Sequence, residues 1–279
     1  MDQQPPAAQT VCYRHPDRPT RLACSECGRP ICPECSRDAV VGQKCPECTT
    51  PAHLTRVIPA RSIRHVGLRG TPVTWVLIAL NAAIFIAGEL FTGFGTELFE
   101  RAAQHPILVE RGEWWRLLSA CFLHGSVLHI LFNMYALWLF GPVLERRFGS
   151  WPFVSLYLAA GVAGGMLYQL IGSNAWAVGA SGAIFGLLGA LLTASYRQRH
   201  TRAGGAVFSQ LLVLLAINLA LPLFVPNIAW QAHVGGLAAG ALIGAVWDRL
   251  PRTKASTWKR VAVAAGVGVA CLAVVVLAG

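Results

Sequence analysis

Long apolar stretches repeat along the chain from about residue 72 to the C-terminus. A helix that crosses a bilayer needs about 20 mostly apolar residues, with a range of about 17 to 25. Seven stretches reach or approach this length, and the fourth is short with a polar start. We therefore expect membrane-spanning helices at residues 72–91, 120–140, 153–171, 181–196, 206–225, 229–247 and 261–277.

The segment between the first two stretches, residues 92–119, has a different character. It contains Glu113-Trp114-Trp115-Arg116, a mixture of aromatic and charged side chains. Such a mixture is typical of a segment that lies in the membrane interface.

Composition supports a membrane protein. Hydrophobic residues make up 54% of the 279 residues and charged residues 13%, whereas about a quarter of a soluble domain is charged. These values disfavour a soluble, a disordered and a nucleic-acid-binding protein. The net charge of +10 is spread over the short gaps between apolar stretches, where membrane topology signals lie.

Basic residues predict the orientation of the helices. They gather before the first stretch, after the second, after the fourth and between the sixth and seventh, which places all four groups on one side of the membrane. The positive-inside rule then puts the N-terminus in the cytoplasm, and seven spans put Gly279 outside. The groups are Arg61, Arg64 and Arg69; Arg146 and Arg147; Arg197, Arg199 and Arg202; and Arg249, Arg252, Lys254, Lys259 and Arg260.

Polar side chains inside spanning helices are costly and tend to be functional. The second, fourth and sixth stretches all enter from outside, so His129, Ser181 and His233 should lie at one depth in the outer half of the bilayer. Three independently placed polar groups at one depth indicate one site. The full set within the stretches is His124, His129, Asn133, Ser181, Asn218 and His233.

Ser181 lies in Gly179-Ala-Ser181-Gly182, where a helix should begin with free backbone N–H groups. His233, Gly236, Gly240 and Gly244 form one stripe with no bulk beyond the imidazole, and Gly182, Gly186 and Gly189 form a second stripe of small residues, so the two helices can approach closely. No Asp or Glu occurs between Arg146 and Trp247, which excludes a Ser–His–Asp triad. A Ser181–His233 dyad remains, with His233 as general base. The candidate oxyanion donors are Gly179, the Ser181 N–H, His129 and Asn133.

These residues resemble the rhomboid intramembrane serine proteases over about residues 72–248. The matching motifs occur in order along the chain, and the ordered set is far more specific than any single motif. They are Trp114-Trp115-Arg116, His124, His129-Ile-Leu-Phe-Asn133, Glu145-Arg-Arg147, Gly179-Ala-Ser181-Gly182, and Ala232-His233-Val-Gly-Gly236 with Gly240.

The resemblance implies a six-helix bundle with the serine on the fourth helix and the histidine on the sixth, plus one additional C-terminal span. It implies Ser181 as nucleophile, His233 as base, and His129, Asn133 and the Ser181 amide as the oxyanion site. His124, Phe185, Trp114 and Arg116 are assigned to support of the site or of the substrate. A tyrosine often occupies the position of Phe185 in the family; stacking on the histidine survives this change, whereas a phenolic hydrogen bond does not.

Structural interpretations compete with several of these roles. His129 and Asn133 can form an interhelical hydrogen-bonded pair, and Gly179-x-Ser181-Gly182 can be a helix cap. Trp114 and Arg116 suit an interfacial anchor better than chemistry, and Glu145 with Arg147 suits a cytoplasmic ion pair. Asn218 is expected to contribute to packing, and Cys121 and Cys271 to be buried small hydrophobes.

The N-terminal 55 residues carry seven of the nine cysteines. Together with His15, these cysteines form four ligand pairs: Cys12 with His15, Cys24 with Cys27, Cys32 with Cys35, and Cys45 with Cys48. Eight such ligands suit two tetrahedral zinc ions. Disulfides are the alternative, but seven is an odd number, and a cytoplasmic N-terminus lies in a reducing space.

The head resembles B-box-like zinc fingers, which implies that pairs one and three share one ion and pairs two and four the other. His53 is a ninth potential ligand. We expect a protein partner or a substrate tail to bind this head, and no nucleic acid.

The predicted fold is an all-α polytopic membrane protein with a small zinc-binding domain. Its parts are residues 1–55 (zinc-binding), 56–71 (basic linker), 72–248 (six-helix membrane domain) and 249–279 (loop and seventh helix).

The predicted function is that of an intramembrane endopeptidase, which acts on membrane-protein substrates in a lipid bilayer. This bilayer is expected to be a bacterial plasma membrane. The alternatives are an inactive relative that binds membrane-protein clients and, less favoured, a transporter, for which no inverted repeat is found. A metalloprotease would need a His-Glu-x-x-His helix, which is absent.

Overall fold

The structure is a computed structural model that describes residues 10–38, 42–49, 70–226, 228–251 and 253–278. Contacts divide the chain into two units, Met1–His65 and Val66–Gly279. The predicted linker and the potential ligand His53 fall almost entirely on residues 50–69, outside the described part, so they stay predictions.

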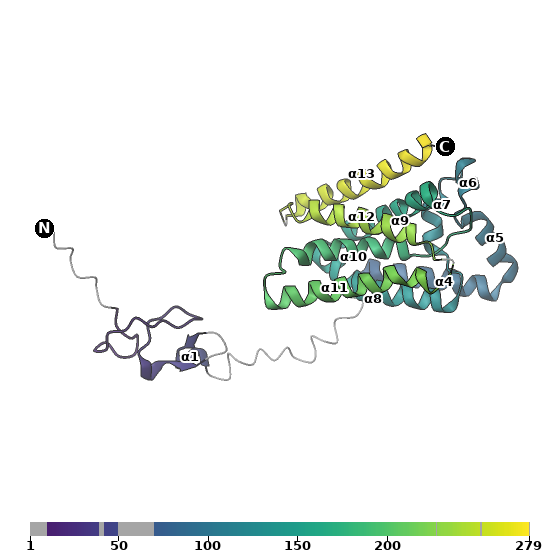
Figure 1. Cartoon of the computed structure of the whole chain (residues 1–279). Helices are drawn as coiled ribbons and strands as arrows, with labels where there is room; N and C mark the ends of the chain where they lie inside the picture. Colours follow the sequence, from purple (N-terminus) through teal and green to yellow (C-terminus); the bar gives the residue numbers. More distant parts are fainter. Residues whose placement is uncertain (1–9, 39–41, 50–69, 227, 252, 279) are drawn as a thin grey trace. The chain divides into compact units, whose positions relative to one another are not determined.

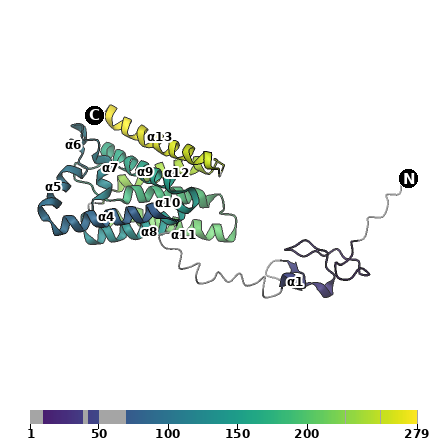
Figure 2. The same cartoon turned by 180° about the vertical axis from the view of Figure 1, so that it is seen from behind.

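The described residues of the second unit form seven long helices and three short ones, which pack side by side as a bundle (Figures 1 and 2). All seven predicted spans are present as helices, most of them within a few residues of the expected ends. The long helices are α4 (Pro72–Leu90), α8 (Val127–Phe148), α9 (Ser150–Ile171), α10 (Ser181–Tyr196), α11 (Arg202–Ala220), α12 (Trp230–Trp247) and α13 (Lys254–Ala278). The short ones are α5 (Thr92–Ala102), α6 (Pro106–Glu110) and α7 (Arg116–Ser119), with the 3₁₀ turns η2 (Ala120–Phe122) and η3 (Leu221–Leu223).

Five of these helices are long and apolar enough to cross a membrane: α4, α8, α9, α11 and α13. The chain is therefore a multi-pass membrane protein. The shorter α10 and the glycine-rich α12 do not meet that criterion. The helix α10 lies in the interior of the bundle, and α12 packs along one side of it. Every residue of α10 from Gly182 to Leu191 is buried.

The short helices α5, α6 and α7 gather at the end of the bundle that also holds the C-terminus (Figure 1). They occupy the segment that the sequence assigned to the interface. Residues 120–126, which we predicted to belong to the second span, instead form η2 and a loop, and α8 begins at Val127. The physical reason is the Ser126 side chain, which accepts a hydrogen bond from the His129 N–H and so caps the helix at this point.

Glu145 anchors the start of α4 and does not pair with Arg147 as predicted. Its carboxylate is 2% exposed and accepts hydrogen bonds from the Val73 N–H (3.0 Å) and from the N–H and hydroxyl of Thr74 (2.8 and 2.7 Å). A negative charge at a helix N-terminus satisfies its free N–H groups and interacts favourably with the helix dipole. Arg147 instead forms an ion pair with Asp248, which follows α12 (2.9 Å).

Substitution Glu145→Ala should lower the free energy of unfolding by about 3 kcal/mol, because several buried donors lose their charged acceptor at once. Denaturant titration of the detergent-purified protein measures this. Glu100→Ala removes an exposed carboxylate from α5 and should leave the stability unchanged. Equal stability of the two variants would contradict the role of Glu145.

Candidate functional site

Ser181 and His233 meet in the structure. Ser181 is the first residue of α10 and His233 the fourth residue of α12, and the distance from Ser181 Oγ to His233 Nε2 is 2.9 Å. This distance is within hydrogen-bonding range. The structure thus brings together the two side chains that the sequence placed at one depth.

Glycines allow α10 and α12 to approach this closely. A Cβ atom added at Gly236 would collide with the carbonyl oxygen of Gly182, and one added at Gly240 would collide with that of Gly186. The two predicted small-residue stripes therefore face each other with their backbones in contact, as in other glycine-mediated helix pairs. Any larger side chain at these positions would separate Ser181 from His233.

Phe185 fixes the plane of the imidazole. Its ring lies parallel to that of His233, with the centroids 4.2 Å apart and an interplanar angle of 8°. His233 is 8% exposed, and its Nδ1 has no hydrogen-bond partner among the described residues. Within the described residues, no Asp or Glu side chain bonds Nδ1 as the third member of a triad would.

The length of α10 sets the depth of Ser181. Sixteen residues at a rise of about 1.5 Å each give a helix of about 24 Å, whereas the hydrocarbon core is about 30 Å thick. If the basic end of the helix lies at the membrane surface, its first residue lies several ångströms below the opposite surface. Ser181 is nonetheless partly exposed, so a reactant can reach it.

His129 lies directly beside the loop that precedes Ser181. A Cβ atom added at Gly179 would be 2.6 Å from His129 Nε2 and 3.8 Å from Ser181 Oγ. Gly179 also has a φ of +125°, a conformation that favours glycine. The lack of a side chain at this position therefore admits the His129 ring against the loop that precedes Ser181.

The set of oxyanion donors needs one correction. The Gly179 N–H donates to the carbonyl oxygen of Ala120 (2.9 Å), so it is not free to bind an oxyanion. The Ser181 N–H has no partner within the described part of the chain. Asn133 is 6% exposed and uses one amide N–H to bond the His129 carbonyl (2.9 Å). Its other N–H is still available as a donor.

His124 belongs to the loop before α8, not to the second span as predicted. Its ring packs edge-on against that of His129, with 5.1 Å between centroids. Both ring nitrogens of His124 are buried without a partner among the described residues. His124 therefore supports the position of His129 by contact.

Arg116 and Trp114 hold different places in the interfacial segment. Arg116 is 4% exposed, pairs with Glu113 (2.6 Å) and donates to the Ala103 carbonyl (2.7 Å), so it braces this segment internally. Trp114 is exposed, as an interfacial anchor should be. Neither makes a hydrogen bond or ring contact with Ser181 or His233 in the described part of the chain.

Gln104 positions the serine loop, a role that sequence reasoning missed. Its backbone pairs with that of Ala177 in both directions (3.1 and 2.9 Å), and its side chain donates to the Gly165 carbonyl of α9 (2.8 Å). Gln104 thereby ties the interfacial segment to the residues before Ser181. The only signal in the sequence was a glutamine two residues before Pro106, which does not indicate such a contact.

The remaining polar and cysteine residues are distributed as follows. Asn218 donates to the Leu214 carbonyl of its own helix (2.8 Å), and its contribution to packing stays a prediction. Cys121 is buried as expected, whereas Cys271 is only partly buried.

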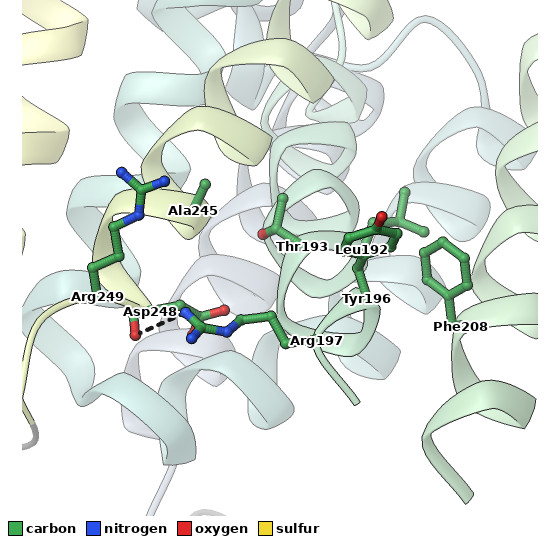
Figure 3. A pocket seen from close by; sticks show the side chains of 8 residues that line it. All are labelled: Leu192, Thr193, Tyr196, Arg197, Phe208, Ala245, Asp248 and Arg249. Atoms are coloured by element: carbon green, nitrogen blue, oxygen red, sulfur yellow. Dashed lines mark hydrogen bonds between the residues drawn. The ribbon is translucent and has the colours of Figure 1, made fainter. Parts of the chain in front are cut away.

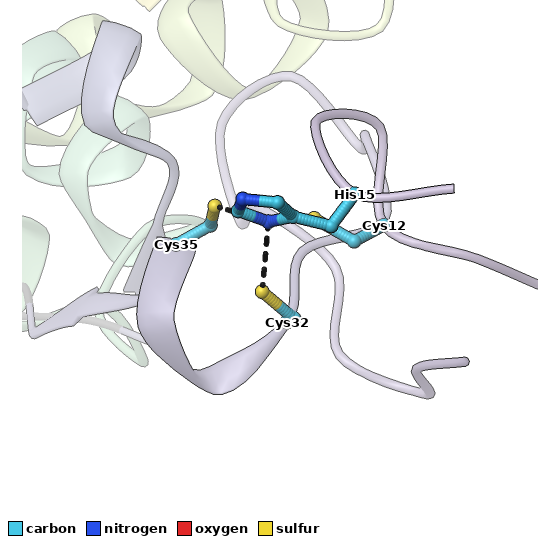
Figure 4. Close-up of side chains that lie close together, drawn as sticks. All are labelled: Cys12, His15, Cys32 and Cys35. Carbon is cyan, nitrogen blue, oxygen red and sulfur yellow. Dashed lines mark hydrogen bonds between the residues drawn. The ribbon is translucent and has the colours of Figure 1, made fainter. Parts of the chain in front are cut away.

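The head gathers its eight predicted ligands into two clusters. One holds Cys12, His15, Cys32 and Cys35 (Figure 4), and the other holds Cys24, Cys27, Cys45 and Cys48. This is the grouping of pairs one with three and two with four that the B-box resemblance implied. Cys35 lies in the 3₁₀ turn η1 (Pro33–Cys35) and Cys48 in the short helix α1 (Pro46–Thr49), and the paired strands β1 (Arg37–Asp38) and β2 (Gln43–Lys44) connect these two elements.

The geometry of the clusters fits zinc. Zinc–sulfur bonds of about 2.3 Å and zinc–nitrogen bonds of about 2.0 Å place the ligands of a tetrahedral ion about 3.5 to 3.8 Å apart. His15 Nδ1 lies 3.4 Å from Cys32 Sγ and 3.5 Å from Cys35 Sγ. All cysteines in the chain are free of disulfides, so the alternative interpretation is not supported.

Backbone groups favour the thiolate form of two of these ligands, Cys12 and Cys24. Burial raises the pKa of the Cys12 thiol, but the backbone N–H groups of Arg14 and Cys32 and the His15 ring outweigh burial and lower this pKa to about 6. The same balance lowers the pKa of Cys24 to about 6. Since zinc binds the thiolate, both cysteines are prepared for the ion.

Comparison with known proteins agrees with both parts of the chain. A model of the Rhomboid domain matches residues 111–249, and a model of the B-box zinc finger matches residues 7–39. The chain is 40% identical to the rhomboid protease GluP of Bacillus subtilis over 171 residues, which are 60% of this chain and 33% of the relative. It is 32% identical to the putative rhomboid protease YdcA of the same organism, over 63% of this chain and 88% of the relative.

A more distant match is the rhomboid-like protease 1 of Toxoplasma gondii, which is 30% identical over 77% of this chain and 74% of the relative. The chain belongs to the rhomboid family, and its N-terminal domain is a B-box zinc finger with ligands for two zinc ions. It spans only a third to a half of the length of GluP and of RHOMBOID-like protein 4 of Arabidopsis thaliana.

Proposed function

We propose that the chain is an intramembrane serine endopeptidase that cleaves membrane-protein substrates with Ser181 as nucleophile and His233 as general base. The observation that carries the proposal is the 2.9 Å contact between Ser181 Oγ and His233 Nε2 at the start of α10. An imidazole at this distance can take the proton of the hydroxyl as it attacks a carbonyl, and can return it to the leaving amine. Phe185 keeps the imidazole in the required plane.

The oxyanion would be stabilised by three donors: the Ser181 N–H, the His129 ring and the free Asn133 amide N–H. All three come from the starts of α10 and α8, which face one another across Gly179. Preorganised donors of this kind stabilise developing charge strongly in a water-poor site. The predicted orientation, with the basic end of the bundle in the cytoplasm, would place cleavage near the outer surface of the membrane.

Labelling with a fluorophosphonate tests the proposal without knowledge of the substrate. The purified full chain should form one adduct, and mass spectrometry should map it to Ser181. An inactive relative that only binds clients would retain the fold but form no adduct at Ser181. Absence of the adduct from a folded preparation would therefore reject catalysis and favour that second function.

Substitutions in the oxyanion site should lower the catalytic rate constant. We expect His129→Ala and Asn133→Ala each to reduce kcat for a single-span substrate by about 10²-fold to 10³-fold, because one donor is lost. KM should change little, since the donors act on the transition state.

Asn218→Ala is the matched control for Asn133→Ala. Each asparagine donates to a carbonyl one turn back in its own helix, at 2.8 Å for Asn218 and 2.9 Å for Asn133. The two substitutions therefore remove the same local bond, but Asn218 is on α11, outside the proposed site. Equal loss of kcat in both variants would show that Asn133 has a structural role only.

A further inference from the structure

A cavity of about 550 Å³ lies at the opposite end of the bundle from Ser181 (Figure 3). Its walls come from the last turn of α10, the first part of α11 and the end of α12. The residues that line it are Leu192, Thr193, Tyr196, Arg197, Phe208, Ala245, Asp248 and Arg249. A volume of this size is typical of pockets that hold small organic ligands.

One wall of the cavity is a helix that the rest of the bundle leaves uncovered. The helix α11, which forms one wall, has no buried residue along its described length, and its Phe208 ring contacts α10 through Tyr196 (5.6 Å between centroids). Leu192, Phe208 and Ala245 give the cavity an apolar side. Whatever occupies it must be partly apolar, because it lies against apolar side chains of all three helices.

The opposite side of the cavity carries cationic groups with spare hydrogen-bonding capacity. Within the described residues, the Arg249 side chain forms no ion pair or hydrogen bond, and that of Arg197 makes only a long bond to the Asp248 carbonyl (3.4 Å). The Asp248 carboxylate forms an ion pair with Arg147 (2.9 Å). The two guanidinium groups on the rim therefore remain uncompensated.

An occupant that suits this arrangement is anionic at one end and apolar at the other. Guanidinium groups bind phosphate oxygens with paired, charge-assisted hydrogen bonds. Basic pockets between membrane helices accordingly suit phosphate headgroups. We infer that the cavity is a binding site for an anionic phospholipid, with the phosphodiester on Arg197 and Arg249 and an acyl chain along Leu192 and Phe208.

Native mass spectrometry of the full chain in detergent, with added phosphatidylglycerol or phosphatidylcholine, tests this site. The wild-type chain should retain one phosphatidylglycerol in preference to phosphatidylcholine. The variant Arg197→Gln/Arg249→Gln should bind phosphatidylglycerol about 30-fold more weakly, since each cationic residue near an anionic lipid contributes about fivefold. Equal retention by this variant and the wild type would overturn the inference.

The matched control is Arg146→Gln/Lys259→Gln. Both of these residues are exposed at the same end of the bundle and line neither this cavity nor the smaller one beside it. The control should keep wild-type affinity; if it weakens binding equally, general charge and not the cavity holds the lipid.

Two further measurements distinguish binding of an intact lipid from binding of phosphate alone and from misfolding of a variant. Ala245→Leu fills the apolar side while every charge remains, and it should also release phosphatidylglycerol, with the unfolding temperature unchanged. Inorganic phosphate should not displace the lipid. Displacement by inorganic phosphate would instead identify a phosphate site without an acyl component and would overturn the lipid assignment.

Discussion

Ser181→Ala should reduce cleavage of a single-span substrate by at least about 10⁴-fold, because loss of a serine nucleophile removes the covalent route altogether. His233→Ala should have an effect of similar size, since the hydroxyl is a poor nucleophile without a base within hydrogen-bonding distance. The double variant should be no slower than either single variant, because the two groups act as one unit. Initial rates in detergent or in proteoliposomes measure all three.

Two substitutions control for structural damage in this experiment. Ser195→Ala removes a hydroxyl near the other end of α10, where it bonds only the Leu192 carbonyl (3.0 Å). His200→Ala removes an exposed imidazole beyond the same helix. Both controls should cleave at the wild-type rate. If Ser181→Ala also retains that rate, or if the losses in the single variants multiply in the double variant, the dyad is not the catalytic unit.

The positions of the helices could be predicted because a bilayer imposes strict demands. Backbone N–H and C=O groups in hydrocarbon must find their hydrogen-bond partners within the same segment, and this forces each long apolar stretch into a helix. The meeting of Ser181 and His233 followed from two further patterns, the alternation of helix direction and the glycine stripes on α10 and α12. Each of these signals is local in sequence, so a single sequence was enough to reveal it.

Contacts between distant residues were the part that could not be predicted. Glu145 bonds Thr74, and Arg147 bonds Asp248, although charge spacing had suggested that Glu145 and Arg147 pair with each other. The bond from the Gly179 N–H to Ala120 likewise depends on how a loop and a helix end pack together. Hydropathy also failed at the start of α8, because the preceding loop is itself apolar.

In the zinc head, the sequence identified the ligands but not how they are grouped around the ions. Ligand spacing identified the four pairs, but any two pairs can in principle share an ion. The grouping came from resemblance to B-box fingers, and the structure shows the physical basis for it. The Cys24 sulfur accepts a hydrogen bond from the Cys45 N–H (3.3 Å), and Cys32 and Cys35 surround His15. Pairing of alternate segments therefore interlocks the whole head around two ions.

Removal of zinc should unfold the head and leave the membrane domain folded. The buried hydrophobic cluster of the head consists of Ile31 and six cysteines, so little apolar side chain remains to hold it together once the ions leave. Structural zinc contributes about 10 to 16 kcal/mol to folding in comparable small domains. We expect about two zinc ions per chain by metal analysis, and rapid proteolysis of residues 10–49 after chelation, with the helices of the second unit still protected.

Single substitutions should separate the two ions. Cys32→Ser and Cys45→Ser each remove one ligand, from different clusters. If the clusters fold independently, each variant should lose one ion and keep the other. If the interlocked head folds as a unit, each variant should lose both ions. Cys271→Ser, a cysteine of α13 outside the head, should retain two ions. Zinc loss in Cys271→Ser, or a wild-type chain that holds no zinc, would refute the assignment. Fluorophosphonate labelling in the same samples should be unaffected, because no zinc ligand belongs to the second unit.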